Sequence, residues 1–278
     1  MTSTNIPAIS LNNGSSLPQI GFGTWQIEDG VVADVVVAAT GIGYRAIDTA
    51  AAYGNEAGVG EGIRRTGLPR AELAVTTKLW NDNQGYDAAL KAFDASLARL
   101  GLDEVDLYLI HWPVPARDLY VETWKALVEI ARQGRARAIG VSNFTAEHLT
   151  KVIDATGVVP AVNQIELHPY FQQAELRAFH AAQGIATQSW SPLGRGPLLT
   201  DPVLVGIAAK HKRTVAQVVV RWHVQLGLIV IPKSVHAERL RENFAVFDFA
   251  LDADDLAAIA WLDRADGRTG PDPEVFGG

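Results

Sequence analysis

The sequence of 278 residues contains no cysteine. Disulfides, thiolate metal ligands and cysteine nucleophiles are therefore excluded. The chain also has no excess of basic residues, because 24 lysines and arginines stand against 31 aspartates and glutamates, a formal net charge of −7. Nucleic acids and anionic membranes attract basic surfaces, so we expect neither as a partner.

No uncharged apolar run reaches the roughly 18–20 residues that a membrane-spanning helix needs. The first seven residues, MTSTNIP, lack the basic and apolar segments of a secretory signal, so we expect a cytoplasmic location. No Ser/Gly-rich linker or block of like charge divides the chain. With 48% hydrophobic and 20% charged residues the composition is that of a globular protein, and we expect one domain over residues 1–278.

Short apolar runs alternate with longer helical patterns along the chain. The runs cover residues 20–23, 44–48, 73–79, 105–110, 136–142, 161–166, 185–190 and 228–232. Between two of them, Leu90, Phe93 and Leu97 recur at the spacing of an amphipathic helix. Eight strands in alternation with helices predict a parallel sheet closed into a (β/α)8 TIM barrel of the α/β class. A doubly wound open sheet is the alternative.

Three features lie outside the eightfold pattern. Asn13 and Gly14, between two short apolar runs, predict an N-terminal β-hairpin. The long interval around Lys210 predicts an extra helix in the C-terminal part, before the eighth strand. The glycine- and proline-rich residues 267–278 predict a tail without regular structure.

Polar residues end three neighbouring strands of the predicted barrel. Asp48, Lys78 and His111 follow the second, third and fourth runs, and Tyr53 lies five residues beyond Asp48. Each has an ordinary structural explanation: a helix cap, a solvated strand end, a structural histidine and a packing phenol. Because the active sites of such barrels lie at the C-terminal ends of the strands, the convergence of all four favours a catalytic site.

The four side chains suit the protonation of an oxyanion. A phenol has a pKa of about 10, and a nearby ammonium favours the phenolate and lowers that value. Lys78 supplies the ammonium, Asp48 pairs with it, and His111 can orient a substrate oxygen. Carbonyl reduction requires such a proton donor, but none of the four can supply electrons, so a hydride-carrying cofactor is needed. We expect no metal, because the sequence has no H-E-x-x-H motif and its seven histidines do not cluster.

Six segments carry a resemblance to a known family. They are GYRAIDTAAAYGNE (43–56), TKLW (77–80), DLYLIHWP (106–113), GVSNF (140–144), NQIELHP (163–169) and IPKS (231–234). In this order and spacing they resemble the aldo-keto reductase superfamily, and within it the prokaryotic 2,5-diketo-D-gluconate reductases.

The resemblance implies NADPH-dependent reduction of a small aldehyde or ketone, a dicarbonyl or a keto-sugar acid such as 2,5-diketo-D-gluconate. Tyr53 would be the general acid of a tetrad with Asp48, Lys78 and His111. The walls of the substrate pocket would be Trp25, Trp80 and Trp112 together with His111, closed by the tail around Phe276. Family members are often monomers, so a monomer is expected.

The resemblance also implies a binding site for NADPH. Its residues would be Gly23, Thr24, Asp48, Ser142, Asn143, Gln164, Trp190, Ser191, Leu193, Gly194, Lys233, Ser234, Val235, Arg239, Glu242 and Asn243. Trp190 would stack under the nicotinamide, and Lys233 and Arg239 would attract the 2′-phosphate. His236 departs from the pattern, since close relatives often carry arginine there and a neutral imidazole attracts phosphate less.

Other functions find less support in the sequence. No tyrosine has a lysine four residues later, and the first strand lacks a complete G-x-G-x-x-G, which argues against short-chain dehydrogenases. A glycosidase needs two carboxylates that flank the scissile bond, whereas the fourth and seventh predicted strands end in His111-Trp112 and Ser189-Trp190, which argues against that function. A Schiff-base aldolase using Lys78 and a non-catalytic, NADP(H)-binding regulatory barrel remain as alternatives.

Overall fold

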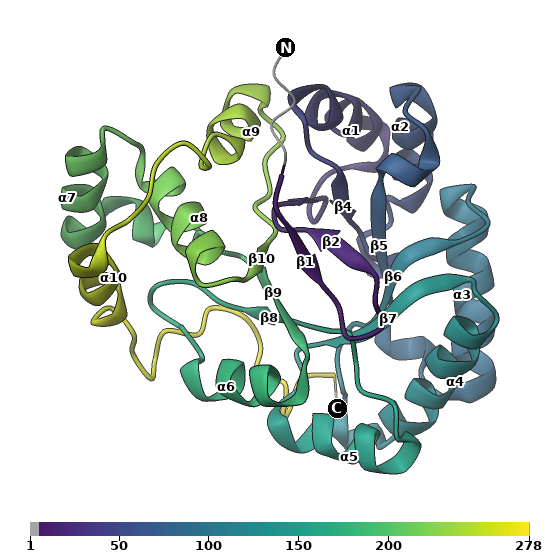
Figure 1. Cartoon of the computed structure of the whole chain (residues 1–278). Coiled ribbons are helices and arrows are strands. Elements are labelled where there is room, and N and C mark those ends of the chain that lie inside the picture. The colour runs from purple at the N-terminus through teal and green to yellow at the C-terminus, as the bar shows by residue number, and fades with distance from the viewer. Residues whose placement is uncertain (1–5, 278) are drawn as a thin grey trace.

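The computed structural model describes residues 6–277. It opens with an antiparallel hairpin of β1 (Ala8–Ser10) and β2 (Ser16–Pro18). The Asn12 side chain donates a hydrogen bond to the carbonyl of Pro160, at the N-terminal start of a barrel strand. Leu11 and Leu17 belong to the same apolar cluster as the barrel interior, so the hairpin covers the N-terminal end of the barrel (Figure 1).

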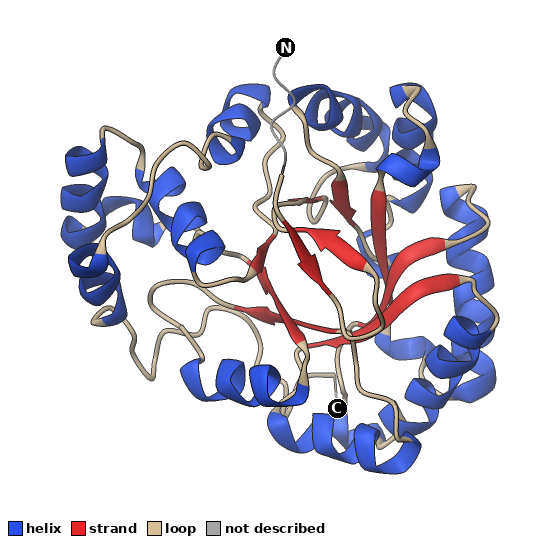
Figure 2. Ribbon diagram, viewed as in Figure 1, coloured by secondary structure: helices blue, strands red, loops and turns tan. Residues whose placement is uncertain are grey.

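Eight parallel strands form the barrel wall (Figure 2). They are β3 (Phe22–Gly23), β4 (Ala46–Asp48), β5 (Ala74–Leu79), β6 (Val105–Ile110), β7 (Ala136–Ser142), β8 (Val162–Glu166), β9 (Ala186–Trp190) and β10 (Ile229–Val230). Neighbours in the chain are neighbours in the sheet, and a parallel bridge between Ile20 and Val230 joins the first strand to the last. The ring is therefore closed, which confirms the predicted barrel and excludes the open doubly wound sheet.

The strands are apolar on both faces because each face is buried. In β6, Leu107 and Leu109 belong to the cluster inside the barrel. Tyr108 and Ile110, on the other face, pack in the layer between sheet and helices. This double burial explains why β6 is a continuous apolar run rather than an alternating one.

Helices surround the sheet (Figure 2). They are α1 (Asp29–Ile42), α2 (Glu56–Thr66), α3 (Tyr86–Leu100), α4 (Tyr120–Arg132), α5 (Ala146–Thr156), α6 (Ala174–Gln183), α7 (Pro202–His211), α8 (Val215–Gln225), α9 (Ala237–Phe244) and α10 (Ala253–Ala260). The predicted spacing in α3 is confirmed, since Phe93 and Leu97 are buried and Leu90 packs against the core. The expected extra helix around Lys210 is α7. Within residues 6–277, no helix is long and apolar enough to cross a membrane.

Residues 261–277, the described part of the chain after α10, have neither helix nor strand, as the composition of the tail predicted. It returns to the barrel, where the backbone N–H of Thr269 donates a hydrogen bond to Glu166 at the end of β8. Further along, the ring of Phe276 packs on Trp112, which follows β6. The tail thus crosses the C-terminal ends of the strands, where the polar residues lie.

Candidate active site

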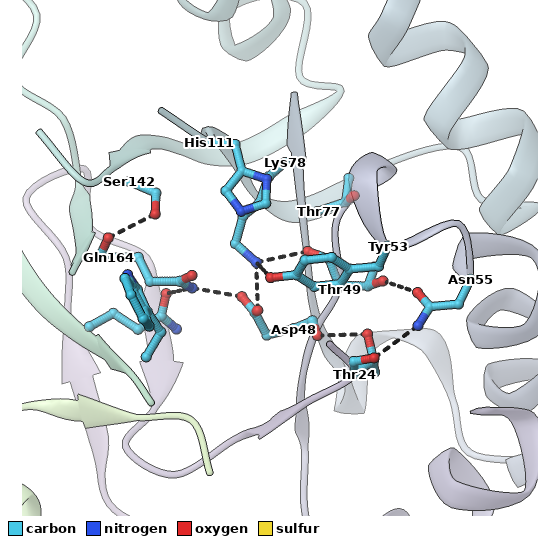
Figure 3. Close-up of polar contacts among 12 residues, drawn as sticks. Thr24, Asp48, Thr49, Tyr53, Asn55, Thr77, Lys78, His111, Ser142 and Gln164 are labelled. Atoms are coloured by element: carbon cyan, nitrogen blue, oxygen red, sulfur yellow. Dashed lines mark hydrogen bonds and ion pairs between the residues drawn. The ribbon is translucent and has the colours of Figure 1, made fainter. Parts of the chain in front are cut away.

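The C-terminal ends of β4, β5 and β6 bring the four predicted catalytic side chains together (Figure 3). Asp48 is the last residue of β4, and Lys78 is the last but one of β5. His111 follows β6 directly, and Tyr53 ends a short 3-10 turn, Ala51–Tyr53, in the loop after β4. Residues 63 positions apart in the chain therefore meet at one mouth because parallel neighbouring strands end at the same edge.

Lys78 is the centre of the cluster. Its Nζ lies 2.6 Å from Asp48 Oδ1 and 2.9 Å from the carbonyl oxygen of Thr49. It also donates to the hydroxyl of Tyr53, at 3.3 Å. The lysine side chain is fully buried, and each of its three N–H donors has a protein oxygen as its acceptor. These contacts fix the position of the ammonium.

Burial by itself would lower the pKa of Lys78, but the neighbouring Asp48 carboxylate and the Tyr53 hydroxyl outweigh it and raise that pKa above its usual value. The side chain therefore remains an ammonium at neutral pH. Asp48 in turn accepts a hydrogen bond at Oδ2 from Gln164 Nε2 at 2.7 Å, so both oxygens of the carboxylate have a donor.

Burial, the largest influence, raises the pKa of the Tyr53 phenol, while the charge of Lys78 opposes the rise. The sequence led us to expect that the ammonium would dominate, and in the structure desolvation does. The physical reason is that burial removes the water that would solvate a phenolate; the Asp48 carboxylate adds to the rise, because its charge also disfavours the phenolate. Tyr53 therefore keeps its proton at neutral pH and faces a cation that stabilises the anion left after donation.

His111 lies beside the phenol, with ring centroids 5.7 Å apart. Burial, and to a lesser extent the charge of Lys78, lower its pKa well below the usual value. The imidazole is thus neutral, and it can donate or accept a hydrogen bond at a substrate oxygen without bringing a charge. Its main-chain carbonyl accepts a hydrogen bond from Asn143 Nδ2 at 3.0 Å, which ties β6 to the loop after β7.

Asn55, which the sequence analysis did not single out, holds the loop that carries Tyr53. It is fully buried, and its Oδ1 accepts from Thr49 Oγ1 at 2.8 Å. Its Nδ2 donates to the main-chain carbonyls of Thr24 and Ile27. The amide thus joins the ends of β3 and β4 (Figure 3), and it fixes the start of the turn that places the phenol.

A cavity of about 1260 Å³ opens above these residues. Of the predicted substrate residues, Trp25, Trp80, His111 and Trp112 all line it, together with Phe276. Of the predicted cofactor residues, those that line it are Gly23, Asp48, Ser142, Asn143, Gln164, Trp190, Ser191, Leu193 and Lys233. One continuous space therefore joins the catalytic cluster to most of the expected cofactor site.

An aromatic ring and a hydrogen-bond acceptor inside the cavity fit a nicotinamide. Trp190 presents a flat ring whose Nε1 donates to Asn143 Oδ1 at 2.8 Å. The side-chain N–H groups of Gln164 are used by Asp48 and Gln188, while its Oε1 accepts no hydrogen bond from residues 6–277. An acceptor beside a fixed aromatic plane suits a carboxamide stacked on that plane.

Seven predicted cofactor residues lie outside the cavity lining. They are Thr24, Gly194, Ser234, Val235, Arg239, Glu242 and Asn243. Thr24 is fully buried, and its hydroxyl donates to the main-chain carbonyl of Asp48. The others, apart from Gly194, lie on α9 or just before it, on the rim beyond Lys233. Ser234 Oγ accepts a hydrogen bond from the backbone N–H of His236, at the start of that helix.

Comparison with known proteins identifies the family. A model of the Aldo/keto reductase family matches residues 19–264. The chain belongs to this family. It is 57% identical over 270 residues, 97% of this chain and 98% of the relative, to an aldo-keto reductase of Mycolicibacterium smegmatis. It is 49% identical over 276 residues, 99% of both chains, to the methylglyoxal reductase DkgA of Escherichia coli.

Solved structures agree with this assignment. A variant of Gox0644 in complex with NADPH superposes with a TM-score of 0.93 at 56% identity, covering 96% of this chain and 97% of the other. A candidate 2,5-diketo-D-gluconic acid reductase B superposes with a TM-score of 0.92 at 39% identity, covering 96% and 94%. The family resemblance predicted from the six segments is confirmed.

Besides Asn55, two side chains of this aldo/keto reductase site were missed by the sequence analysis. Arg195, in the loop after β9, lines the cavity with its guanidinium 5.5 Å from the centre of the Trp25 ring. Glu166, at the end of β8, accepts hydrogen bonds from the backbone N–H groups of Thr269 and Gly270. No local signal could have revealed the second contact, because its partners lie 103 and 104 residues away. Within residues 6–277, no cluster of three or more ligating side chains could hold a metal ion.

Proposed function

We propose that this chain reduces a small aldehyde or ketone to an alcohol with NADPH, and that Tyr53 is the general acid. The observation that carries the proposal is the contact at 3.3 Å between the Tyr53 hydroxyl and the Nζ of Lys78, itself ion-paired with Asp48, on the wall of an aromatic cavity. Among the chemistries open to this family, a protonated phenol backed by a fixed cation suits the capture of a developing alkoxide.

NADPH supplies the hydride when it is bound. Tyr53 donates its proton to the carbonyl oxygen as negative charge develops there. Lys78 stabilises the phenolate that remains, and Asp48 keeps the lysine in place. Neutral His111 orients the carbonyl oxygen toward the phenol through a hydrogen bond. Because these groups are already positioned and largely buried, little reorganisation is needed during the reaction.

The cofactor residues predicted from the sequence belong to the same proposal. Trp190 stacks on the nicotinamide, and Gln164 accepts a hydrogen bond from its carboxamide. Lys233 and Arg239 attract the 2′-phosphate, so NADPH is preferred over NADH even though His236 adds no fixed charge. The NADPH complex of the similar Gox0644 supports this choice of cofactor. A single domain acting as a monomer remains part of the proposal.

Two classes of substrate accord with the names of similar proteins. Methylglyoxal, the substrate in the name of DkgA, is a neutral dicarbonyl, and 2,5-diketo-D-gluconic acid is an anionic keto acid. The proposed function includes both classes, a dicarbonyl or a keto-sugar acid.

The test is a kinetic screen that follows NADPH oxidation with methylglyoxal, aromatic aldehydes and sugar keto acids, repeated with NADH. We expect turnover of several carbonyls and a higher kcat/KM for NADPH. Tight binding of NADPH without turnover of any carbonyl would favour the non-catalytic regulatory barrel instead. A covalent adduct at Lys78, trapped with borohydride and a keto substrate, would favour the aldolase.

A further inference from the structure

We infer that the substrate end of the cavity selects uncharged carbonyl compounds and discriminates against those that carry a carboxylate. The inference rests on the proposed carbonyl reduction and narrows it to one of its two substrate classes. It follows from where the charged side chains of the cavity lie relative to Tyr53.

Aromatic rings surround the approach to the phenol. Trp80 follows β5, and its ring lies 5.2 Å from the ring of His111. The ring of Phe276, from the tail, lies 4.5 Å from that of Trp112 and 6.4 Å from that of Trp80. A carbonyl compound that reaches Tyr53 is therefore enclosed by π-faces and ring edges, which favour apolar and aromatic groups.

The two basic groups nearest the phenol offer no cation to a substrate. Lys78 is fully buried and already paired with Asp48, with its remaining donors directed to Thr49 and Tyr53. His111 is neutral, because burial and the lysine charge lower its pKa well below the usual value. Together the lysine and the aspartate contribute no net charge to this end of the cavity.

The other cations that line the cavity, among residues 6–277, are Arg195 and Lys233. They follow β9 and β10, whereas Trp80 and Trp112 follow β5 and β6. In the ring order of the sheet, β5 and β6 lie across the barrel from β9 and β10. Both cations therefore lie across the barrel from Trp80 and Trp112. The guanidinium of Arg195 reaches the ring of Trp25, at 5.5 Å, and the wall that Trp80, Trp112 and Phe276 form is lined by neither cation.

A substrate carboxylate would have to move from water to a site between aromatic side chains, where no cation is available to pair with it. Burying an unpaired anion is far more costly than burying an amide, which can be satisfied by a few hydrogen bonds. Discrimination should appear as lower kcat/KM for the anion, since the penalty is paid on reaching the transition state.

The experiment compares 3-formylbenzamide with 3-formylbenzoate, which share a ring and a similar volume but differ in charge at about pH 7. Each kcat/KM with saturating NADPH is divided by the rate at which borohydride reduces the same aldehyde, to remove the electronic difference. We expect the amide to exceed the carboxylate by at least about tenfold. A ratio near one, or a preference for the carboxylate, overturns the inference while leaving carbonyl reduction intact.

A matched pair of variants tests the cause. Phe276→Arg places a cation beside Trp112 and should move the ratio toward the carboxylate by about tenfold. Phe276→Met, of similar length and no charge, should leave the ratio as it is. An unchanged ratio in the arginine variant, in protein that still reduces the amide, contradicts the inference.

A third variant, Arg195→Gln, tests whether Arg195 contributes to cofactor binding or to binding of a substrate carboxylate. If Arg195 serves the cofactor side, its loss lowers kcat/KM for both aldehydes by the same factor. A selective loss with 3-formylbenzoate identifies Arg195 as an anchor for substrate carboxylates and overturns the inference. Failure of the unaltered chain to reduce either aldehyde or methylglyoxal overturns the proposed function and this inference with it.

Discussion

At the scale of single residues, the site depends on how one phenol is protonated and what faces it. Burial keeps the proton on Tyr53, and the Lys78 ammonium lies 3.3 Å from the hydroxyl, where it can stabilise the phenolate that forms after proton donation. The sequence could predict which residues meet, because Asp48, Lys78 and His111 each end a strand. It could not predict that desolvation outweighs the lysine charge, because burial depends on the whole cavity wall.

Tyr53→Phe removes the acid and keeps the ring. We expect kcat for the best substrate of the screen to fall by about 10²–10⁴-fold, the usual contribution of a positioned general acid. NADPH affinity, measured by quenching of tryptophan fluorescence, should stay within about twofold, since phenylalanine keeps the ring and the hydroxyl is hydrogen-bonded to Lys78, which is not among the predicted cofactor residues. A variant that keeps near-original kcat would show that another group supplies the proton.

At the scale of elements, one buried carboxylate accepts several of the hydrogen bonds that attach the tail after α10 to the barrel. Glu166 accepts from the N–H groups of Thr269 and Gly270 and from the hydroxyl of Thr269, and its pKa is lowered to about 2. Burial opposes this lowering, and hydrogen bonds from His168, Thr269 and Gly270 outweigh the burial. The carboxylate therefore stays ionised throughout the working pH range, and the tail is held over the cavity at every such pH.

Glu166→Gln keeps the size of the side chain but places an NH2 group against two backbone donors. We expect the tail to loosen, so that KM for the carbonyl rises about three- to tenfold while kcat falls less, because Tyr53 and Lys78 are untouched. Limited proteolysis after Arg264 or Arg268 should become faster. Glu175→Gln, on the exposed start of α6, is the matched control and should change neither. Equal KM and equal proteolysis in both variants would show that the carboxylate does not hold the tail.

Element boundaries show what the sequence could and could not predict. The predicted strands 105–110 and 136–142 match β6 and β7, because β6 is buried along its whole length and β7 at every position except Arg137. The predicted strands 20–23 and 228–232 shrink to Phe22–Gly23 and Ile229–Val230. Pro232 has no N–H to give to the ladder, which ends the last strand early. These shorter strands depend on how the first and last strands of the barrel pair with each other, and a local sequence pattern does not predict that pairing.

At the scale of the whole molecule, buried neutral histidines tie helices to the barrel. His180, on α6, accepts a hydrogen bond at Nε2 from the Asn163 amide of β8. Its Nδ1 lies 2.8 Å from Thr187 Oγ1 of β9, so Nδ1 carries the proton. Burial lowers the pKa of His180 to about 4, and burial likewise lowers the pKa of His223, on α8, to about 4. Protonation of either imidazole would place an additional N–H donor and a positive charge in the buried core.

The sign of the resulting pH dependence follows from these lowered values. Between about pH 6.5 and about pH 4, each of these histidines binds a proton in the unfolded chain but not in the folded chain. The free energy of unfolding therefore falls as the pH drops toward about 4, and this contribution is constant above about pH 6.5. Between about pH 7.5 and pH 5, His180 alone should cost about 2 kcal/mol of unfolding free energy. His180→Gln preserves an acceptor and a donor without titrating, so its urea-unfolding midpoint should fall less over this range than that of the unaltered chain. His236→Gln, at an exposed position, should leave the pH dependence unchanged. Parallel curves for His180→Gln and the unaltered chain would mean that His180 has the same pKa in the folded and the unfolded chain, and would contradict the lowering of its pKa by burial.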